Sequence, residues 1–241
     1  MAKPLRIVAL GSSFAAGPGI TPIEDTIATR SARNYAHIVA ERLQAKLDDR
    51  SASGATLCHV LDERQKFFTT SLSPQLHTLD ADVVFLTAGG NDIGYSLGMI
   101  RDSVLPFLGT LNYQVDLDAR LAAVVKRVKE LAPKAKMYLV EYLTVFGSDR
   151  TDVLNAERVR HYQKQAEHLA RTYKKVADRY ENVEVIKMSS LSFDHGVGSQ
   201  TPWVTGFSWS MFWHGIVPYH PNREGHEAVA EAILAAMNKS G

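Results

Sequence analysis

Three short segments of the chain carry residue types that could together perform acyl chemistry. Ser12 and Ser13 follow Gly11, Asn91 follows Gly89-Gly90, and His220 precedes Pro221-Asn222. A serine hydroxyl becomes a nucleophile when a histidine takes its proton, and amide N–H groups stabilise the oxyanion that forms. Each segment also has a structural explanation, since glycine, serine and asparagine are common in turns and helix caps. No single segment decides between acyl chemistry and a purely structural role.

The elements that must position these segments follow a strand–helix alternation. Short apolar runs predict buried strands over 5–10, 82–88, 136–143 and 183–188, with a weaker fifth over 55–61. Helical periodicity predicts helices over 34–47, 116–132, 151–181 and 222–237, and a long loop over 189–221. The pattern predicts a doubly wound α/β sheet, whose ligands bind beyond the carboxyl ends of the strands. Without a repeat or linker, 1–241 is expected to be one domain.

Composition excludes several classes of protein. The 241 residues are 45% hydrophobic and 22% charged, and 27 Lys+Arg balance 26 Asp+Glu. This balance gives no electrostatic reason to expect nucleic acid or an anionic membrane as a partner. The single cysteine, Cys58, cannot form an internal disulfide, and we expect it to pack in the 55–61 strand. No apolar run approaches the roughly 18–20 residues of a membrane span, and no signal peptide is evident, so a cytoplasmic protein is expected.

Taken together, the segments resemble the four sequence blocks of the SGNH (GDSL-type) hydrolases. The GDS block corresponds to Gly11-Ser12-Ser13, the glycine block to Ser53-Gly54-Ala55-Thr56, and the G-x-N-D block to Gly89-Gly90-Asn91-Asp92. The D-x-x-H block corresponds to Val217-Pro218-Tyr219-His220. The blocks occur in the family's order over residues 11 to 222. The resemblance implies a three-layer α/β/α sandwich around a five-stranded parallel sheet, of flavodoxin-like type.

The resemblance also implies the roles of the site residues. Ser13 would be the nucleophile and His220 the general base, with no cofactor and no metal. The oxyanion hole would consist of the Ser13 and Gly54 backbone N–H groups and the Asn91 side-chain amide. Without the resemblance, Gly54 would pass for a turn glycine, and Asp92 is more simply explained as a turn-forming residue.

The chain departs from the family pattern at two positions. Ser12 replaces the usual Asp beside the nucleophile, which we expect to be tolerated. Val217 replaces the acid that orients the histidine, and a backbone carbonyl can instead accept the Nδ1 proton. We therefore expect a Ser13–His220 dyad oriented by a carbonyl within 214–217. Asp194 is the second choice as an acid, and an inactive site is the third possibility.

Two other groups of residues suggest functions. Three tryptophans precede His220, and we favour their lining an acyl pocket over tethering a loop, namely Trp203, Trp209 and Trp213. His214, His220 and His226 are spaced by six residues, which matches no helical pair of metal ligands, so no metal site is expected.

The function that these observations favour is a serine esterase acting on small-molecule carboxylic esters. The same site would serve an acyltransferase or a carbohydrate O-acetyl esterase. A catalytically inactive binding protein of the same fold is the remaining alternative, and its only support is the missing acid at Val217.

Overall fold

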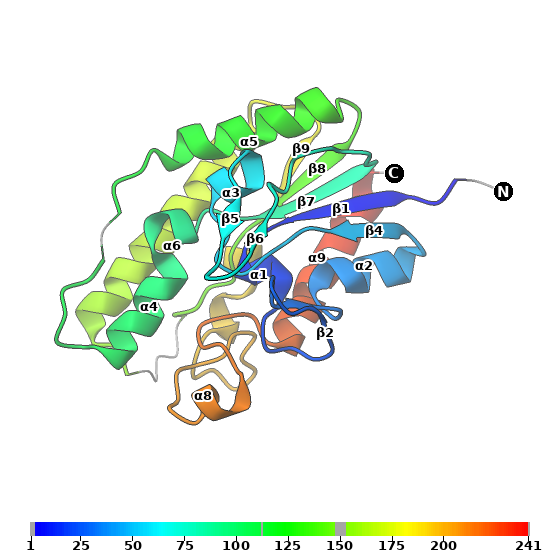
Figure 1. Cartoon of the computed structure of the whole chain (residues 1–241). Helices are drawn as coiled ribbons and strands as arrows, with labels where there is room; N and C mark the ends of the chain where they lie inside the picture. Colours follow the sequence, from blue (N-terminus) through cyan, green and yellow to red (C-terminus); the bar gives the residue numbers. More distant parts are fainter. Residues whose placement is uncertain (1–2, 112, 148–152, 241) are drawn as a thin grey trace.

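The computed structural model describes residues 3–111, 113–147 and 153–240. Its centre is a parallel sheet in the order β4-β1-β7-β8-β9 (Figure 1). The strands are β1 (Arg6–Gly11), β4 (Lys46–Asp49), β7 (Val83–Thr87), β8 (Lys136–Val140) and β9 (Val183–Ile186). Four of the five predicted strands are confirmed. Because all strands run in the same direction, the ends of β1 and β7 that carry the Ser12-Ser13 and Gly90-Asn91 segments meet at one edge.

Helices cover both faces of the sheet, as the doubly wound prediction requires. On one face α2 (Tyr35–Leu43) packs against α9 (Arg223–Ser240) (Figure 1). The other face carries α3 (Leu57–Leu61), α5 (Leu117–Leu131) and α6 (Ala156–Ala177), and α4 (Tyr95–Val104) packs against α6. The start of the helix predicted over 151–181 lies partly outside the described residues, and α6 itself begins after Asn155, whose side chain accepts from the Arg158 N–H.

Short elements complete the chain. They are the hairpin of β2 (Ile23–Asp25) and β3 (Arg30–Ser31), the hairpin of β5 (Gln65–Lys66) and β6 (Ser71–Leu72), and the single turns α1 (Ser13–Ala16), α7 (Met188–Leu191), α8 (Met211–His214), η1 (Asn91–Ile93) and η2 (Phe193–His195). Three of these turns interrupt or border the predicted 189–221 loop. The loop is tied to the body by the Val197 N–H, which donates to the Val145 carbonyl at 2.8 Å.

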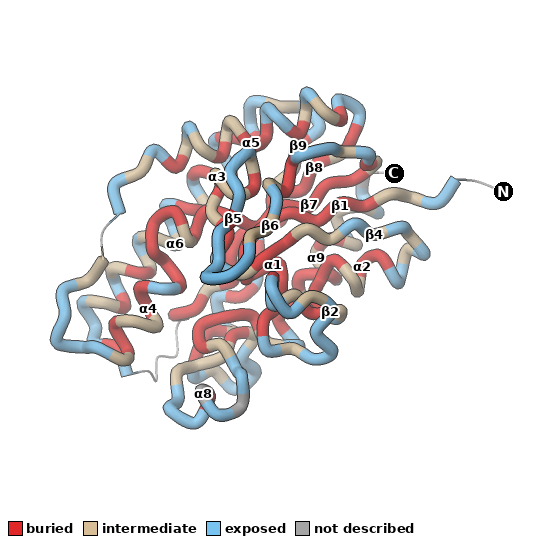
Figure 2. The backbone as a smooth tube through the Cα atoms, viewed as in Figure 1, coloured by how far each residue is buried: buried red, intermediate tan, exposed pale blue. Residues whose placement is uncertain are grey.

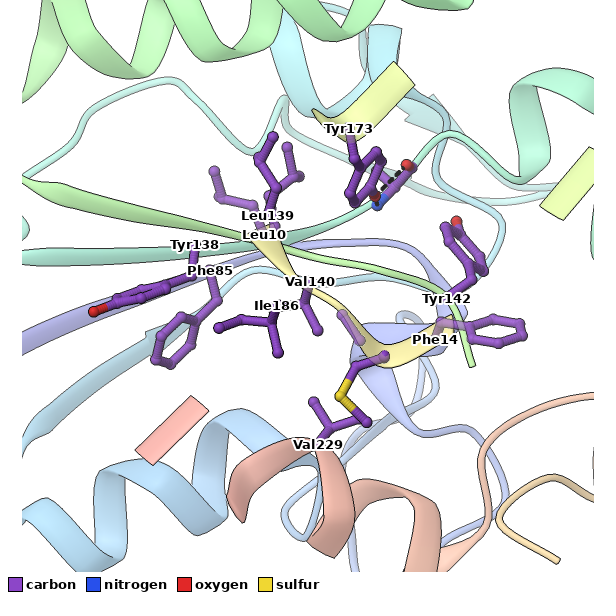
Figure 3. Close-up of a cluster of buried hydrophobic side chains, with 14 of the residues drawn as sticks. Leu10, Phe14, Phe85, Tyr138, Leu139, Val140, Tyr142, Tyr173, Ile186 and Val229 are labelled. Atoms are coloured by element: carbon purple, nitrogen blue, oxygen red, sulfur yellow. Dashed lines mark hydrogen bonds between the residues drawn. The ribbon is translucent and has the colours of Figure 1, made fainter. Parts of the chain in front are cut away.

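The core lies on both faces of the central strands. Every residue of β7 is buried, and Figure 2 shows the central strands mainly buried while much of the helices is exposed. Leu10 and Leu139 extend to one side of the sheet, and Phe85 and Ile186 extend to the other (Figure 3). Such burial explains why the central strands β1, β7 and β8 appear in the sequence as continuous apolar runs rather than alternating ones.

The prediction of the fifth strand is wrong. The strand is β4, whose residues Lys46–Asp49 alternate between exposed and half-buried because β4 lies at the sheet edge. It therefore lacks a continuous apolar run. The predicted 34–47 helix stops at Leu43 because Gln44 adopts a left-handed conformation with φ of 50°, and the Ala45 N–H returns to the Ala40 carbonyl at 2.9 Å.

Residues 55–61, the expected strand, instead form the helix α3. Thr56 caps it: its hydroxyl accepts from the His59 N–H, and the His59 Nδ1 accepts from the Thr56 N–H at 3.1 Å. This reciprocal pair of bonds is a capping box, which favours a helix over a strand. Cys58 therefore lies in a helix and is half-buried.

Among the residues that the structure describes, none of the helices combines the length and the apolar character that crossing a bilayer requires.

Candidate active site

The loop after β1 holds Ser13 in a fixed place. Gly11 has a φ of 145°, and a Cβ there would lie 2.3 Å from the Thr87 carbonyl oxygen, so the close approach of β1 to β7 requires glycine. The Ser12 N–H donates to the same carbonyl at 2.8 Å. Ser13 then begins the single turn α1 and is only 6% exposed.

His220 lies against Ser13 although 207 residues separate them in the sequence. The Ser13 hydroxyl and the His220 Nε2 are 2.8 Å apart, and the His220 Nδ1 is 2.8 Å from the Pro218 carbonyl oxygen. A carbonyl oxygen only accepts, so Nδ1 carries the proton and Nε2 is left to accept from the Ser13 hydroxyl. The backbone therefore selects the tautomer in which His220 can act as a base toward Ser13.

The carbonyl that orients His220 is not within the expected 214–217 stretch but belongs to Pro218. The reason is the intervening Tyr219, whose φ of 60° turns the chain so that the Pro218 carbonyl points back at the imidazole. Asp194 is wrong as the acid, because Pro218 occupies the Nδ1 position and Asp194 lies exposed in η2.

Burial decides the charge of the imidazole. His220 is 4% exposed, and burial lowers its pKa to about 4, although the hydrogen bond to Pro218 opposes the shift. The ring of Phe14 lies 5.1 Å away and contributes to the apolar surroundings. His220 is therefore neutral at neutral pH, the state in which it accepts a proton.

A second buried histidine, His226, lies at the start of α9. Burial and the neighbouring His220 lower its pKa to about 3. Its Nδ1 accepts from the Tyr35 N–H at 3.1 Å, which joins α9 to α2. Among the described residues no group of three or more His, Cys, Asp or Glu is arranged to hold a metal ion, and the His214 side chain lies outside the described part.

Three residues that carry donor groups, Ser13, Gly54 and Asn91, line one cleft. The Ser13 N–H opens α1 and so has no intrahelical acceptor. The Gly54 N–H lies in a backbone with φ of 80° and has no protein acceptor within the described part of the chain. Asn91 donates one amide hydrogen to the Ala55 carbonyl at 2.9 Å, which leaves the second for the cleft.

Asp92 is not the simple turn residue that its sequence suggested. Its carboxylate is buried and accepts from the Leu57 N–H at 2.9 Å and from the Arg120 guanidinium at 2.8 Å. Asp92 thus fixes the start of α3 relative to η1. Because Gly54 precedes α3 and Asn91 begins η1, this carboxylate sets the spacing of two of the three donors.

Tyr142 joins the Gly90 turn to the serine turn. The Gly90 N–H donates to the Tyr142 hydroxyl at 2.9 Å, and that hydroxyl lies 3.1 Å from the Ser12 Oγ. The Ser12 Oγ in turn donates to the Thr87 carbonyl at 3.4 Å, so it must accept from Tyr142. Tyr142 is buried against Phe14, with ring centroids 4.5 Å apart (Figure 3). Ser12 therefore takes part in a directed chain of hydrogen bonds in place of the family's Asp.

These groups open into a cleft of about 430 Å³. Its volume is that of a small-molecule site. The described residues that line it include no Asp, Glu, Lys or Arg; they are Ser13, Pro18, Gly19, Thr29, Ser53, Gly54, Thr56, Asn91, Gly94, Ser96, Leu97, Ile100, Tyr113, Gly215, Val217 and His220.

The three tryptophans do not line this cleft, contrary to expectation. Trp203 stacks on His195 with ring centroids 3.8 Å apart, and Trp209 packs edge-on against Phe207. Trp213 is 88% exposed. Trp203 thus holds the long loop together, which is the tethering role left as the alternative.

The residues that form the cleft walls were not among the predicted site residues. Thr29, Leu97, Ile100 and Tyr113 come from three separate segments, and none belongs to a recognisable block. The one sequence feature that could have pointed to them is that Leu97 follows Asn91 by only six residues.

The chain also resembles known proteins in sequence. Residues 9–228 match the GDSL-like lipase/acylhydrolase family. Lipase 2 of Streptomyces coelicolor is 25% identical over 261 residues, covering 97% of this chain and 86% of that protein.

Solved structures share the fold. Phospholipase A1 from Streptomyces albidoflavus superposes with a TM-score of 0.77 at 20% identity, covering 97% of this chain and 99% of that one. An acetylxylan esterase from Geobacillus stearothermophilus, in a catalytic mutant, has a TM-score of 0.61 at 17% identity and covers 98% and 94%. The three-layer fold implied by the four blocks is confirmed. On the strength of the match over residues 9–228, the chain belongs to the GDSL-like lipase/acylhydrolase family and is a carboxylic ester hydrolase of the SGNH type.

Proposed function

We propose that this protein is a serine esterase that works through an acyl-enzyme on Ser13, with His220 as the general base and no acidic third member. One observation carries the proposal: the Ser13 Oγ lies 2.8 Å from the unprotonated Nε2 of His220, in a cleft that both residues line. An inactive member of the family would have no reason to keep this bond or the tautomer that it needs.

The first half of the reaction acylates the serine. As the Ser13 oxygen bonds to the carbonyl carbon of the ester, its proton passes to the His220 Nε2. The carbonyl oxygen becomes an oxyanion, held by the Ser13 and Gly54 N–H groups and by Asn91. When the carbon–oxygen bond to the alcohol breaks, His220 returns the proton to the alcohol oxygen. The second half repeats these steps with water, which releases the acid and restores the Ser13 hydroxyl.

The Pro218 carbonyl performs one of the two tasks of a triad acid. It fixes the Nδ1–H tautomer and the ring orientation, while its partial charge stabilises an imidazolium less than a carboxylate does. The oxyanion formed beside Ser13 supplies the opposite charge only while the proton resides on His220. Stabilisation is then concentrated in the transition state, where it increases the rate.

The test is hydrolysis of p-nitrophenyl butyrate by Ser13→Ala. We expect activity to fall to background, because no other hydroxyl lies within hydrogen-bonding distance of the His220 Nε2 in the described structure. Ser210→Ala serves as the control, since Ser210 is exposed and outside the cleft. Full activity in Ser13→Ala would refute the proposal.

A further inference from the structure

The walls of the cleft differ in chemistry on either side of Ser13. Ser53 follows β4 and Leu97 follows β7, and these two strands flank β1, which leads to Ser13. From Asn91 the chain continues into α4, whose Leu97 and Ile100 line the cleft one turn apart. Tyr113 closes the same wall. Its ring lies so close to residue 94 that a Cβ at this position would be 2.5 Å from the ring. Gly94, whose φ is 71°, has no Cβ and therefore leaves room for Tyr113. This wall, defined by Leu97, Ile100 and Tyr113, is called the α4 wall below.

The α4 wall is fixed in place by charged residues that stay out of the cleft. Arg158 donates to the Pro106 and Leu108 carbonyls at 2.8 and 2.6 Å, and Arg101 donates to the Gly109 carbonyl at 2.8 Å. These bonds pin residues 106–109, which follow α4. An apolar surface that is open to solvent yet held by such a network is suited to an alkyl chain.

The opposite wall is polar and is held in a strained conformation. Thr29 donates a hydrogen bond to the Ser53 Oγ, 2.6 Å away, and both side chains line the cleft. Thr29 has a φ of 49°, an outlier for a β-branched residue, and such strain concentrates at ligand sites. Its neighbours maintain it: the Ala28 carbonyl accepts from the Ser53 N–H at 2.9 Å, and Arg30 donates to the Ser51 carbonyl at 2.7 Å.

We propose that the cleft binds an uncharged ester in one orientation, with an alkyl acyl chain along the α4 wall and a hydroxyl-bearing alcohol, such as a polyol, against Thr29 and Ser53. The inference rests on the proposed function. It follows from matching each part of an ester to the wall of like chemistry. The absence of charged side chains among the described lining residues leaves a phosphate or carboxylate on the substrate without a counter-ion.

The length of the α4 wall limits the acyl chain. Six residues separate Gly94 from Ile100, and at about 1.5 Å per residue they span about 9 Å, roughly six to eight carbon–carbon bonds. The substrate class is therefore medium-chain esters of small polyols.

The acyl half is tested with p-nitrophenyl octanoate and p-nitrophenyl acetate. Leu97→Gln should reduce the ratio of kcat/KM for octanoate over acetate about tenfold, because the alkyl chain loses an apolar contact. Leu191→Gln is the matched control: both leucines lie in helices, with 58% and 56% exposure, and Leu191 is outside the cleft. An unchanged ratio in Leu97→Gln overturns the proposal. The proposal is also overturned if Leu97→Gln instead lowers the ratio of kcat/KM for octyl acetate over propyl acetate. That result would place the alkyl chain of the alcohol, rather than the acyl chain, along the α4 wall.

The alcohol half is tested by comparing the hydrolysis of glycerol 1-octanoate with that of methyl octanoate. The released acid is measured in both cases. Thr29→Val keeps the branched shape and removes the hydroxyl, and it should lower the preference for the glycerol ester about fivefold, whereas Thr29→Ser should retain it. Adding a phosphate to the glycerol should lower kcat/KM of the unaltered protein. Equal preference in the two Thr29 variants, or equal use of the phosphorylated ester, contradicts the proposal. If the unaltered protein hydrolyses none of these esters, the proposed function itself fails; if it hydrolyses them without these preferences, only this inference does.

Discussion

The Nδ1 of His220 lies 2.8 Å from the carbonyl oxygen of Pro218, two residues earlier in the chain. A main-chain group therefore occupies the position that an acid takes in a Ser-His-Asp triad. The left-handed Tyr219 makes this possible, since it reverses the chain between the two residues. The orientation of His220 depends on backbone geometry rather than on the charge of another side chain.

Removal of the Asp194 carboxylate, which lies in the loop before His220, should have little effect on ester hydrolysis. We expect Asp194→Asn to keep kcat within about twofold of the unaltered enzyme, because the His220 Nδ1 is bonded to the Pro218 carbonyl. In a true triad, the equivalent change costs about 10⁴-fold. Ester hydrolysis at pH 7.5 measures the difference, and a loss of several orders of magnitude would restore Asp194 as the third member.

The pH dependence of hydrolysis should follow the lowered pKa of His220. Protonated His220 cannot accept the Ser13 proton, so activity falls as the pH drops through the pKa, which burial lowers to about 4. We expect kcat/KM to stay level from pH 8 down to about pH 5 and to fall below it. An acidic limb centred near pH 6.5, the pKa of an unperturbed histidine, would show that the free enzyme does not bury His220 in this way.

The same shift makes stability depend on pH. Between pH 6.5 and about 4 the unfolded chain protonates this histidine while the folded protein does not, so the free energy of unfolding decreases as the pH falls through that window. From pH 6.5 to 5 the loss from this group is about 2 kcal/mol. Urea unfolding of the unaltered protein and of His220→Gln at both pH values isolates the contribution of His220 to this loss of stability. An equal loss of stability in the two proteins would be the contrary result.

Asn91 should contribute to the transition state rather than to binding. We expect Asn91→Ala to lower kcat about 10²- to 10³-fold with little change in KM, as for one lost oxyanion donor. Steady-state hydrolysis of p-nitrophenyl butyrate separates the two constants. A rise in KM with unchanged kcat would assign Asn91 to substrate binding.

Tyr142 should act through the turn that carries Asn91. Tyr142→Phe removes the acceptor of the Gly90 N–H, so we expect kcat to fall about tenfold through misplacement of the Asn91 amide. In the Asn91→Ala background the same change should cost less than about twofold, because the group it positions is already gone.

A second buried tyrosine provides the control for Tyr142. The Tyr35 hydroxyl is 3.0 Å from the Thr87 Oγ1 but does not touch the Gly90 turn, so Tyr35→Phe should change kcat little. Equal losses of kcat from Tyr142→Phe with and without Asn91 would show that Tyr142 acts independently of that amide.

The residues that we propose to perform the chemistry could be located in the sequence because each lies in a block of fixed order. Ser13, Asn91 and His220 follow strands or open a helix, so the sheet topology brings them to one edge once the strands are located. The edge strand β4 was not predictable, because one side faces solvent and its sequence, KLDD, lacks an apolar run.

Other parts of the site depend on information that a local pattern does not contain. The direction of the Pro218 carbonyl follows from a positive φ at Tyr219, and tyrosine gives no sign of such a conformation. The cleft walls combine residues as distant as Thr29 and Tyr113, which meet only after folding. The prediction that the three tryptophans line the cleft was wrong, because residues that cluster in the sequence need not face the same site.

Covalent labelling tests the Ser13–His220 pair most directly. A fluorophosphonate probe at pH 7.5, followed by peptide mapping, should modify Ser13 alone, and His220→Ala should label far more slowly because the hydroxyl has lost its base. Modification of a different residue, or equal labelling rates with and without the imidazole, would contradict the assignment of a Ser13–His220 dyad.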